Sequence, residues 1–166
     1  MIRSFDCKTP QIAETAFVSE TAYVIGEVEI GEHSGIWPGA VLRGDSGRIK
    51  LGDNVDVEDN SVLHGEMDIG SNVVIGHGVV MHGRRIGNNV IIGSNATILF
   101  DAEIEDNCVV AAGAVVTDGT SIPAGSFATG IPAKVKSEVS GGQKALLQRH
   151  LDYYPALLRK YLEEGL

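Results

Sequence analysis

An aliphatic residue recurs at every sixth position along most of the chain. The series pauses after Leu42, resumes at Leu51 and loses one residue between Met81 and Ile86. A mostly small residue follows each member four positions later. A period of six fits neither a helix nor a single strand, but it fits short strands joined by corners. The members are Ile12, Val18, Val24, Ile30, Ile36, Leu42, Leu51, Val57, Leu63, Ile69, Ile75, Met81, Ile86, Ile92, Ile98, Ile104, Val110, Val116 and Ile122.

Three such six-residue units close one triangular coil. Positions one and five of each unit point inward and position two points outward. Positions three and four turn the corner, and Gly, Asn or Asp often stands there, as in Asp53-Asn54 and Asn88-Asn89. These residues tolerate left-handed backbone angles. We therefore expect residues 1–137 to be an all-β body, a parallel β-helix of about six to seven coils, each ~4.8 Å tall. The strictness of the series argues against a β-sandwich.

Residues 138–166 differ from this body, because they contain leucine where the body has valine and isoleucine. Leu147, Leu151, Tyr154 and Leu158 fall on one helical stripe. We expect a C-terminal helix packed outside the β-helix. Gly141-Gly142 would precede it as a hinge, and Pro155 would kink or divide it.

Charge and cysteine content narrow the function classes. The formal net charge of −9 disfavours nucleic acid and anionic membranes as partners. No apolar run approaches the ~20 residues that span a bilayer, and the N-terminus has no signal-peptide core. Two cysteines cannot form a disulfide framework. These features predict a soluble cytoplasmic protein.

Three of the five histidines share a register. His64 and His82 both occupy the outward second position and lie 18 residues apart, which stacks them on one face with backbones ~4.8 Å apart. His77 lies at a corner on the preceding face and cannot easily join them within one chain. A neighbouring subunit could supply it, so we expect a homotrimer with three interfacial metal sites. His33 and His150 are expected to be solvated surface residues.

The face that carries His77 has an outward column of partly small residues, which we expect another subunit to approach. Three neutral imidazoles leave an open position on zinc, which is the catalytic arrangement. The pattern predicts Zn²⁺, with Fe²⁺ or Co²⁺ as alternatives. The column comprises Ser19, Trp37, Glu58, Gly76, Gly93 and Ala111.

Three segments together resemble one known family, and a fourth resembles a motif of a wider group. The segments 41–45 (VLRGD), 58–64 (EDNSVLH) and 76–83 (GHGVVMHG) are similar to motifs of the gamma-class carbonic anhydrases, and 130–134 (GIPAK) is similar to the closing motif of many hexapeptide proteins. The resemblance implies a left-handed β-helix and a homotrimer with metal at the subunit interfaces.

The resemblance also implies the roles of individual residues. It makes His64, His77 and His82 the metal ligands. It makes Arg43 and Asp45 an intersubunit ion pair and Asp59 a polar neighbour of the site. We therefore take Glu58, Asp59 and Arg43 as the candidate catalytic residues.

The chain departs from the family in three ways. Glu58 replaces a usual glutamine, Asp56 replaces a usual asparagine, and only four residues separate His64 from Ile69, so the acidic proton-shuttle loop is missing. Because that loop is absent, we expect Glu58 to accept the proton that hydration of carbon dioxide releases.

The sequence therefore predicts a carbonic anhydrase-like lyase in which zinc-bound hydroxide converts carbon dioxide to bicarbonate. Three alternatives stay open. One is a metal-dependent thioesterase or acyl-CoA-related hydrolase on the same scaffold. Another is a hexapeptide acyltransferase, and the last is a metal-stapled trimer with only a structural role.

Overall fold

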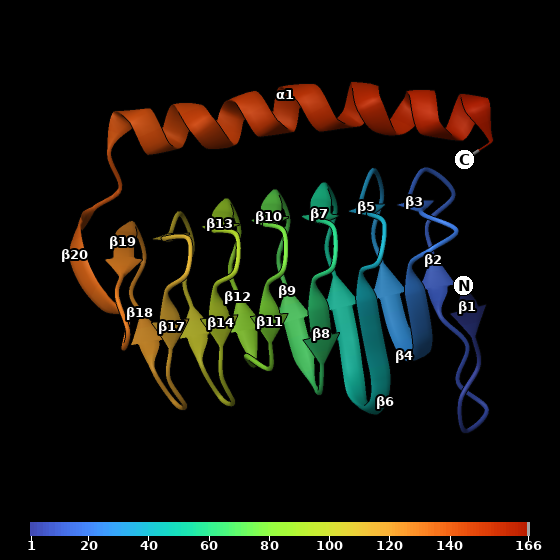
Figure 1. Ribbon diagram of the computed structural model, residues 1–166, viewed down its shortest axis with the longest axis horizontal. Helices are drawn as coiled ribbons and strands as arrows, with labels where there is room; N and C mark the ends of the chain where they lie inside the picture. The colour runs from blue at the N-terminus through green and yellow to red at the C-terminus, as the bar shows by residue number, and fades with distance from the viewer. Residues whose placement is uncertain (166) are drawn as a thin grey trace.

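The computed structural model describes residues 1–165 and contains twenty strands, most of them short, and one helix (Figure 1). The strands are β1 (Ile2–Arg3), β2 (Gln11–Ile12), β3 (Phe17–Val18), β4 (Tyr23–Ile30), β5 (Gly35–Ile36), β6 (Val41–Leu51), β7 (Val55–Val57), β8 (Val62–His64), β9 (Met67–Ile69), β10 (Val73–Ile75), β11 (Val80–Met81), β12 (Arg85–Ile86), β13 (Val90–Ile92), β14 (Thr97–Ile98), β15 (Glu103–Ile104), β16 (Val109–Val110), β17 (Val115–Val116), β18 (Ser121–Ile122), β19 (Ser126–Thr129) and β20 (Lys134–Glu138). The helix is α1 (Gly141–Glu164).

The strands wind into a left-handed parallel β-helix of about seven turns, as expected. Face A contains β8, β11, β14 and β17, and face B contains β9, β12, β15 and β18. The long strands β4 and β6 contribute to both of these faces. Face C contains β3, β5, β7, β10, β13, β16 and β19. Antiparallel β20 ends that sheet.

The core is the inward six-residue series. Leu42, Leu63, Met81 and Ile98 lie in one column of face A, and each is fully buried. Most of the small fifth-position residues are buried too. The predicted pattern of inward positions is therefore confirmed.

Asparagines turn many of the corners. Asn54, Asn72, Asn89 and Asn107 all have φ between 54° and 59°. Their side-chain amides form a hydrogen-bonded ladder in which each donates to the next at 3.1–3.3 Å. The left-handed corners expected from the sequence are confirmed.

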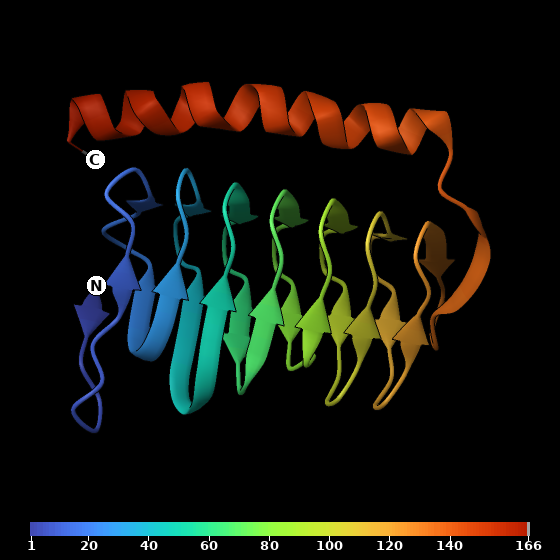
Figure 2. The ribbon, with the colours of Figure 1, turned by 180° about the vertical axis from the view of Figure 1, so that it is seen from behind.

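Helix α1 lies along the outside of face C (Figures 1 and 2). Ser140 caps it and forms a capping box with Gln143. Gly141-Gly142 therefore belongs to the first turn rather than to a hinge before it. The helix also continues through Pro155 and is not divided there.

Helix α1 covers the outward side chains of face C. Phe17, Trp37 and Leu158 are at most 4% exposed and form a cluster with Tyr154 and Tyr161. The column from Ser19 to Ala111 was expected to receive another subunit. Its first half is instead covered by the chain's own helix, because Trp37 of that half packs against Tyr154 and Tyr161 of the helical stripe.

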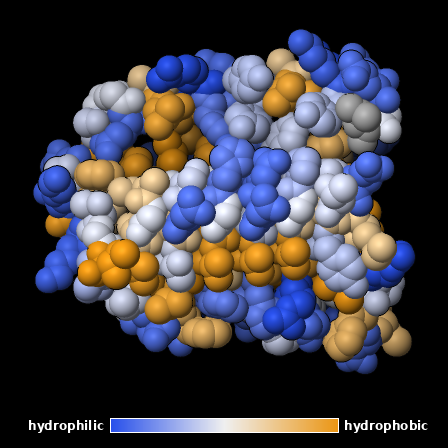
Figure 3. Space-filling view, viewed as in Figure 1, coloured by the Kyte–Doolittle hydropathy of each residue, from blue (hydrophilic) through white to orange (hydrophobic). Residues whose placement is uncertain are grey.

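Face A has no such cover from any part of residues 1–165. Besides the column that carries His64 and His82, this face has a second outward column, which consists of Tyr23, Val41, Val62, Val80, Thr97 and Val115. Tyr23 is 36% exposed and Val80 39%. Figure 3 shows a row of apolar surface crossing successive coils on the side turned to the viewer. Within residues 1–165, no helix has the length and hydropathy to cross a membrane.

Candidate functional site

His64 and His82 stack on face A as the register predicted. Their ring centroids are 5.3 Å apart, with an interplanar angle of 80°. Phe100 covers the other side of His82, with a centroid separation of 4.6 Å. His82 Nδ1 is buried without a hydrogen-bond partner. A buried polar atom that lacks a partner is uncommon and needs a reason.

An insertion within β6 surrounds His64 with polar groups. Arg43 Nη2 donates to His64 Nδ1 at 3.0 Å, and Ser46 Oγ lies 3.0 Å from Nε2. Arg43 Nη1 also donates to Asp45 Oδ2 at 2.9 Å. Arg43 and Asp45 thus pair within one chain here. Pairing between subunits stays a prediction.

His77 lies at the corner between β10 and β11, where face C meets face A. Its side chain is 56% exposed. Asp59 Oδ2 is 3.1 Å from Nδ1, and Glu58 Oε2 is 3.3 Å from Nε2. Across residues 1–165, no three His, Cys, Asp or Glu side chains gather closely enough to hold a metal. A site that used all three histidines would need more than one chain.

Glu58 is buried between the solenoid and α1. Tyr154 Oη donates to its Oε1 at 2.9 Å, and the backbone N–H of His77 donates to its Oε2 at 3.1 Å. His150 Nε2 lies 3.5 Å from Oε1. Burial, followed by the nearby carboxylate of Glu58, raises the pKa of Tyr154 and keeps this phenol protonated.

His150 is not the solvated residue expected from the sequence. It stacks on Tyr154 with ring centroids 3.9 Å apart, and its side chain is 17% exposed. Burial, with a smaller effect from His77, lowers the pKa of His150 to about 4. The missed signal was the four-residue spacing of His150 and Tyr154, which puts both on the packed side of one helix.

Asp56 completes this polar cluster. Trp37 Nε1 donates to its Oδ1 at 2.8 Å, and His150 Nε2 is 3.8 Å from its Oδ2. Burial, opposed by the Trp37 hydrogen bond and assisted by Glu58, raises the pKa of Asp56 to about 7. Asp56 and Glu58, the two carboxylates that differ from the usual gamma-class residues, therefore both lie next to His150 beneath α1.

The donor set fits a transition-metal ion. Imidazole nitrogen is a common ligand of Zn²⁺, Fe²⁺ and Co²⁺. The unpartnered Nδ1 shows that His82 is not committed to a hydrogen bond on that side. Asp59 sits beside His77 in the manner of the carboxylates that orient metal-binding histidines.

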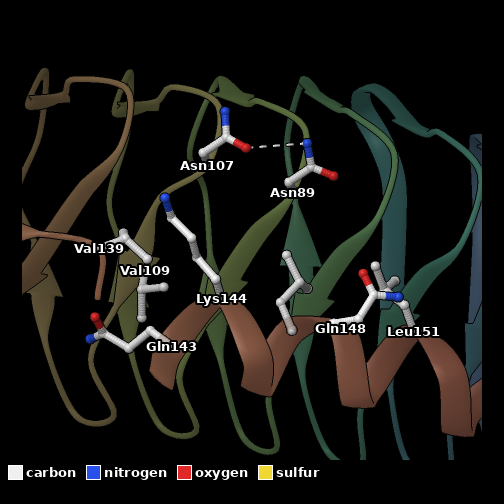
Figure 4. A pocket seen from close by; sticks show the side chains of 9 residues that line it. Asn89, Asn107, Val109, Val139, Gln143, Lys144, Gln148 and Leu151 are labelled. Carbon is white, nitrogen blue, oxygen red and sulfur yellow. Dashed lines mark hydrogen bonds between the residues drawn. The ribbon is translucent and has the colours of Figure 1, made fainter. Parts of the chain in front are cut away.

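Two other features lie apart from this cluster. His33 is exposed at a left-handed corner, with φ of 56°. A cavity of about 270 Å³ lies between α1 and face C (Figure 4), and none of the predicted site residues lines it. Its lining is mostly amide and aliphatic, and in Figure 4 Asn89 donates to Asn107 across its edge.

Sequence comparison identifies hexapeptide repeats and carbonic anhydrase relatives. Residues 66–100 match the family described as "Bacterial transferase hexapeptide (six repeats)" and residues 84–118 the "Hexapeptide repeat of succinyl-transferase". A carbonic anhydrase of Geobacillus kaustophilus is 44% identical over 64 residues, which are 39% of this chain and 35% of that protein. The mitochondrial gamma carbonic anhydrase 1 of Arabidopsis thaliana is 44% identical over 64 residues, or 23% of its length. The matched segment thus spans about a third or less of these curated relatives.

Structural comparison extends the similarity to nearly the whole chain. A hexapeptide transferase family protein of Anaplasma phagocytophilum superposes with a TM-score of 0.90 at 32% identity. The match covers 96% of this chain and 97% of that one. With the repeat and the coil register, this similarity shows that the chain belongs to the hexapeptide-repeat transferase family, and the 64-residue segment that it shares with the carbonic anhydrase relatives is gamma-carbonic-anhydrase-like.

Proposed function

We propose that the protein is a metal-dependent carbonic anhydrase-like enzyme that interconverts carbon dioxide and bicarbonate at the interfaces of a homotrimer. The observation that carries this proposal is the division of the histidines. His64 and His82 stack on face A, whereas His77 stands at the face C corner with its ring half-exposed. A rotated second copy would bring His77 to the other pair, and a closed ring of three copies would make three equivalent sites.

The residues around these imidazoles have separate tasks. Arg43 donates to His64 Nδ1 in the single chain; because this hydrogen bond uses the one free lone pair of the neutral ring, Arg43 must release His64 when the ring binds a cation. Asp59 lies beside His77 Nδ1 and leaves Nε2 as the nitrogen available for binding. A divalent cation held there would act as a Lewis acid that makes water a nucleophile at neutral pH. Zn²⁺, Fe²⁺ and Co²⁺ all suit the imidazole donors.

The direct test is a hydration assay on protein loaded separately with Zn²⁺ and with Fe²⁺, beside metal-free protein. The proposal expects activity only in a loaded form. A thioester-cleavage assay on the same samples addresses the hydrolase alternative. Cleavage without hydration would move the proposal to that reaction class, and metal-independent acyl transfer would remove the metal proposal altogether.

Shared sites have a further test that does not depend on the substrate. Variants His77→Ala and His82→Ala are refolded separately and as a mixture, and bound metal is measured. The separate variants should bind little metal, whereas mixed trimers should recover some complete sites. Mixed trimers that form but recover no metal would contradict ligands from two chains.

A further inference from the structure

Both oxygens of the Glu58 carboxylate are held in place. The side chain is only 8% exposed. The hydroxyl of Tyr154 on α1 donates to Oε1, and the backbone N–H of His77 donates to Oε2. A carboxylate held from two elements is pre-organised and loses little conformational freedom when it binds a further group.

The side of the carboxylate that faces away from α1 lies next to the His77 ring. Oε2 lies 3.3 Å from His77 Nε2, while the other ring nitrogen faces Asp59. Bond lengths of about 2.0–2.1 Å to nitrogen and 2.0–2.2 Å to oxygen put neighbouring tetrahedral ligands roughly 3.3–3.5 Å apart. The observed separation of 3.3 Å falls within this range, so one cation could bind both atoms without a large movement of either side chain.

The charges around Glu58 also favour a bound cation. Within residues 1–165, the ion-pair contacts of Glu58 are with His77 and His150 and include no lysine or arginine. Asp56, a second buried carboxylate, lies in the same cluster. Buried carboxylates are paired or coordinate metals, so a metal ion at His77 would also neutralise Glu58.

We propose that Glu58 is itself a metal ligand, which binds through Oε2 beside His77. His64 and His82 of the neighbouring copy would complete a site of three histidines and one glutamate. This inference rests on the proposed function, because it needs the interfacial metal. It gives Glu58 a different role from the proton acceptance expected from the sequence.

The fourth ligand changes what the site does. Three imidazoles and a carboxylate fill a tetrahedron, so the substrate must enter at a fifth position. The carboxylate also lowers the net charge of the site and adds a hard oxygen ligand. Relative to a site of three histidines, it shifts preference toward harder ions such as Fe²⁺.

The experiment measures Co²⁺ binding to metal-free trimers of the wild type, Glu58→Gln and Asp56→Asn. Co²⁺ reports its ligands through its visible absorption bands. Glu58→Gln should weaken Co²⁺ binding by about 10²-fold or more, since changing residues that only support ligands already weakens binding 10–100-fold. Its absorption bands should also change. The matched control Asp56→Asn removes a neighbouring buried carboxylate that is not a proposed ligand, so it should keep the wild-type spectrum and weaken Co²⁺ binding far less than Glu58→Gln does.

The outcomes separate this inference from the proposed function. If His82→Ala loses Co²⁺ but Glu58→Gln keeps wild-type affinity and absorption, the ligand role is wrong and the shared metal site stands. A roughly 10²-fold slower turnover in that case would make Glu58 a proton acceptor. If wild-type trimers bind no Co²⁺, both proposals fail. Should Glu58→Gln not assemble, Glu58→Asp keeps the charge but withdraws the oxygen, and an unchanged spectrum there would overturn the ligand role.

Discussion

Faces A and C are built from the same six-residue repeat but have different surroundings. A second outward column of face C, which precedes the inward series and includes Phe17, Val74 and Ile91, is buried, and α1 lies over that face. The corresponding column of face A, which includes Val62 and Val80, stays partly exposed. An uncovered apolar row on the surface of a folded chain is typical of an interaction surface. The comparison therefore moves the expected subunit contact from face C to face A.

The histidines follow the same division. His64 and His82 project from the uncovered face, whereas His77 stands at the edge of the covered one. Helix α1 contributes to the His77 side through Tyr154 and His150. One half of the proposed site is therefore solenoid alone, and the other half depends on the helix.

The largest expected effect is the loss of bound metal when a histidine of the uncovered face A is replaced. His82→Ala should remove nearly all bound metal and the metal-dependent activity, because it deletes one of the three proposed imidazole ligands. Metal analysis of purified trimers checks this. His33→Ala changes an exposed corner histidine and should leave the metal content intact, so equal metal in both variants would refute the ligand assignment.

One charged substitution on face A and one on face C test which face contacts another copy of the chain. Val62→Asp places a carboxylate in the half-exposed column of face A and should give folded monomers, because association would bury an unpaired charge. Light scattering and circular dichroism measure the two properties. Val74→Asp, in the column beneath α1, should instead destabilise the monomer itself. A stable Val62→Asp trimer would exclude face A as the interface.

The packing of α1 can be weakened without touching the site. Leu158 is 4% exposed in the cluster with Phe17 and Trp37. Leu158→Ala should lower the free energy of unfolding by about 3 kcal/mol, a usual value for a buried leucine. Denaturant unfolding gives this value. Leu162→Ala, at an exposed position of the same helix, should change it by less than about 0.5 kcal/mol.

The smallest expected effect depends on pH. Because the pKa of Asp56 is raised to about 7 in the folded protein, the folded state holds this proton more tightly than the unfolded state. Stability therefore falls as pH rises between about 4 and 7. Asp56→Asn removes this dependence.

The measurement compares the stability gained by Asp56→Asn at pH 5 and at pH 8. The gain should be larger at pH 8 by roughly 2–3 kcal/mol, the free energy that the raised pKa implies over this interval. The lowered pKa of His150 acts in the opposite direction between about 4 and 6.5 and is present in both proteins. An equal gain at both pH values would contradict the raised pKa.

The sequence by itself determined the solenoid. The six-residue series places an aliphatic side chain inward at each unit, and a slip of register would expose a whole column. The same period was enough to stack His64 on His82 and to separate His77 from them. These features follow from the spacing of residues along the chain alone.

Only the tertiary structure decided what lies over each face. The helical stripe of α1 could be seen in the sequence, but nothing local says which column it meets, because packing between distant segments depends on shape and burial. The packing of α1 on face C buried His150 against Asp56 and Glu58. It also covered a face that was expected to receive another subunit. Tyr154 reaches Glu58 across 96 residues of sequence, a contact that only the folded solenoid brings together.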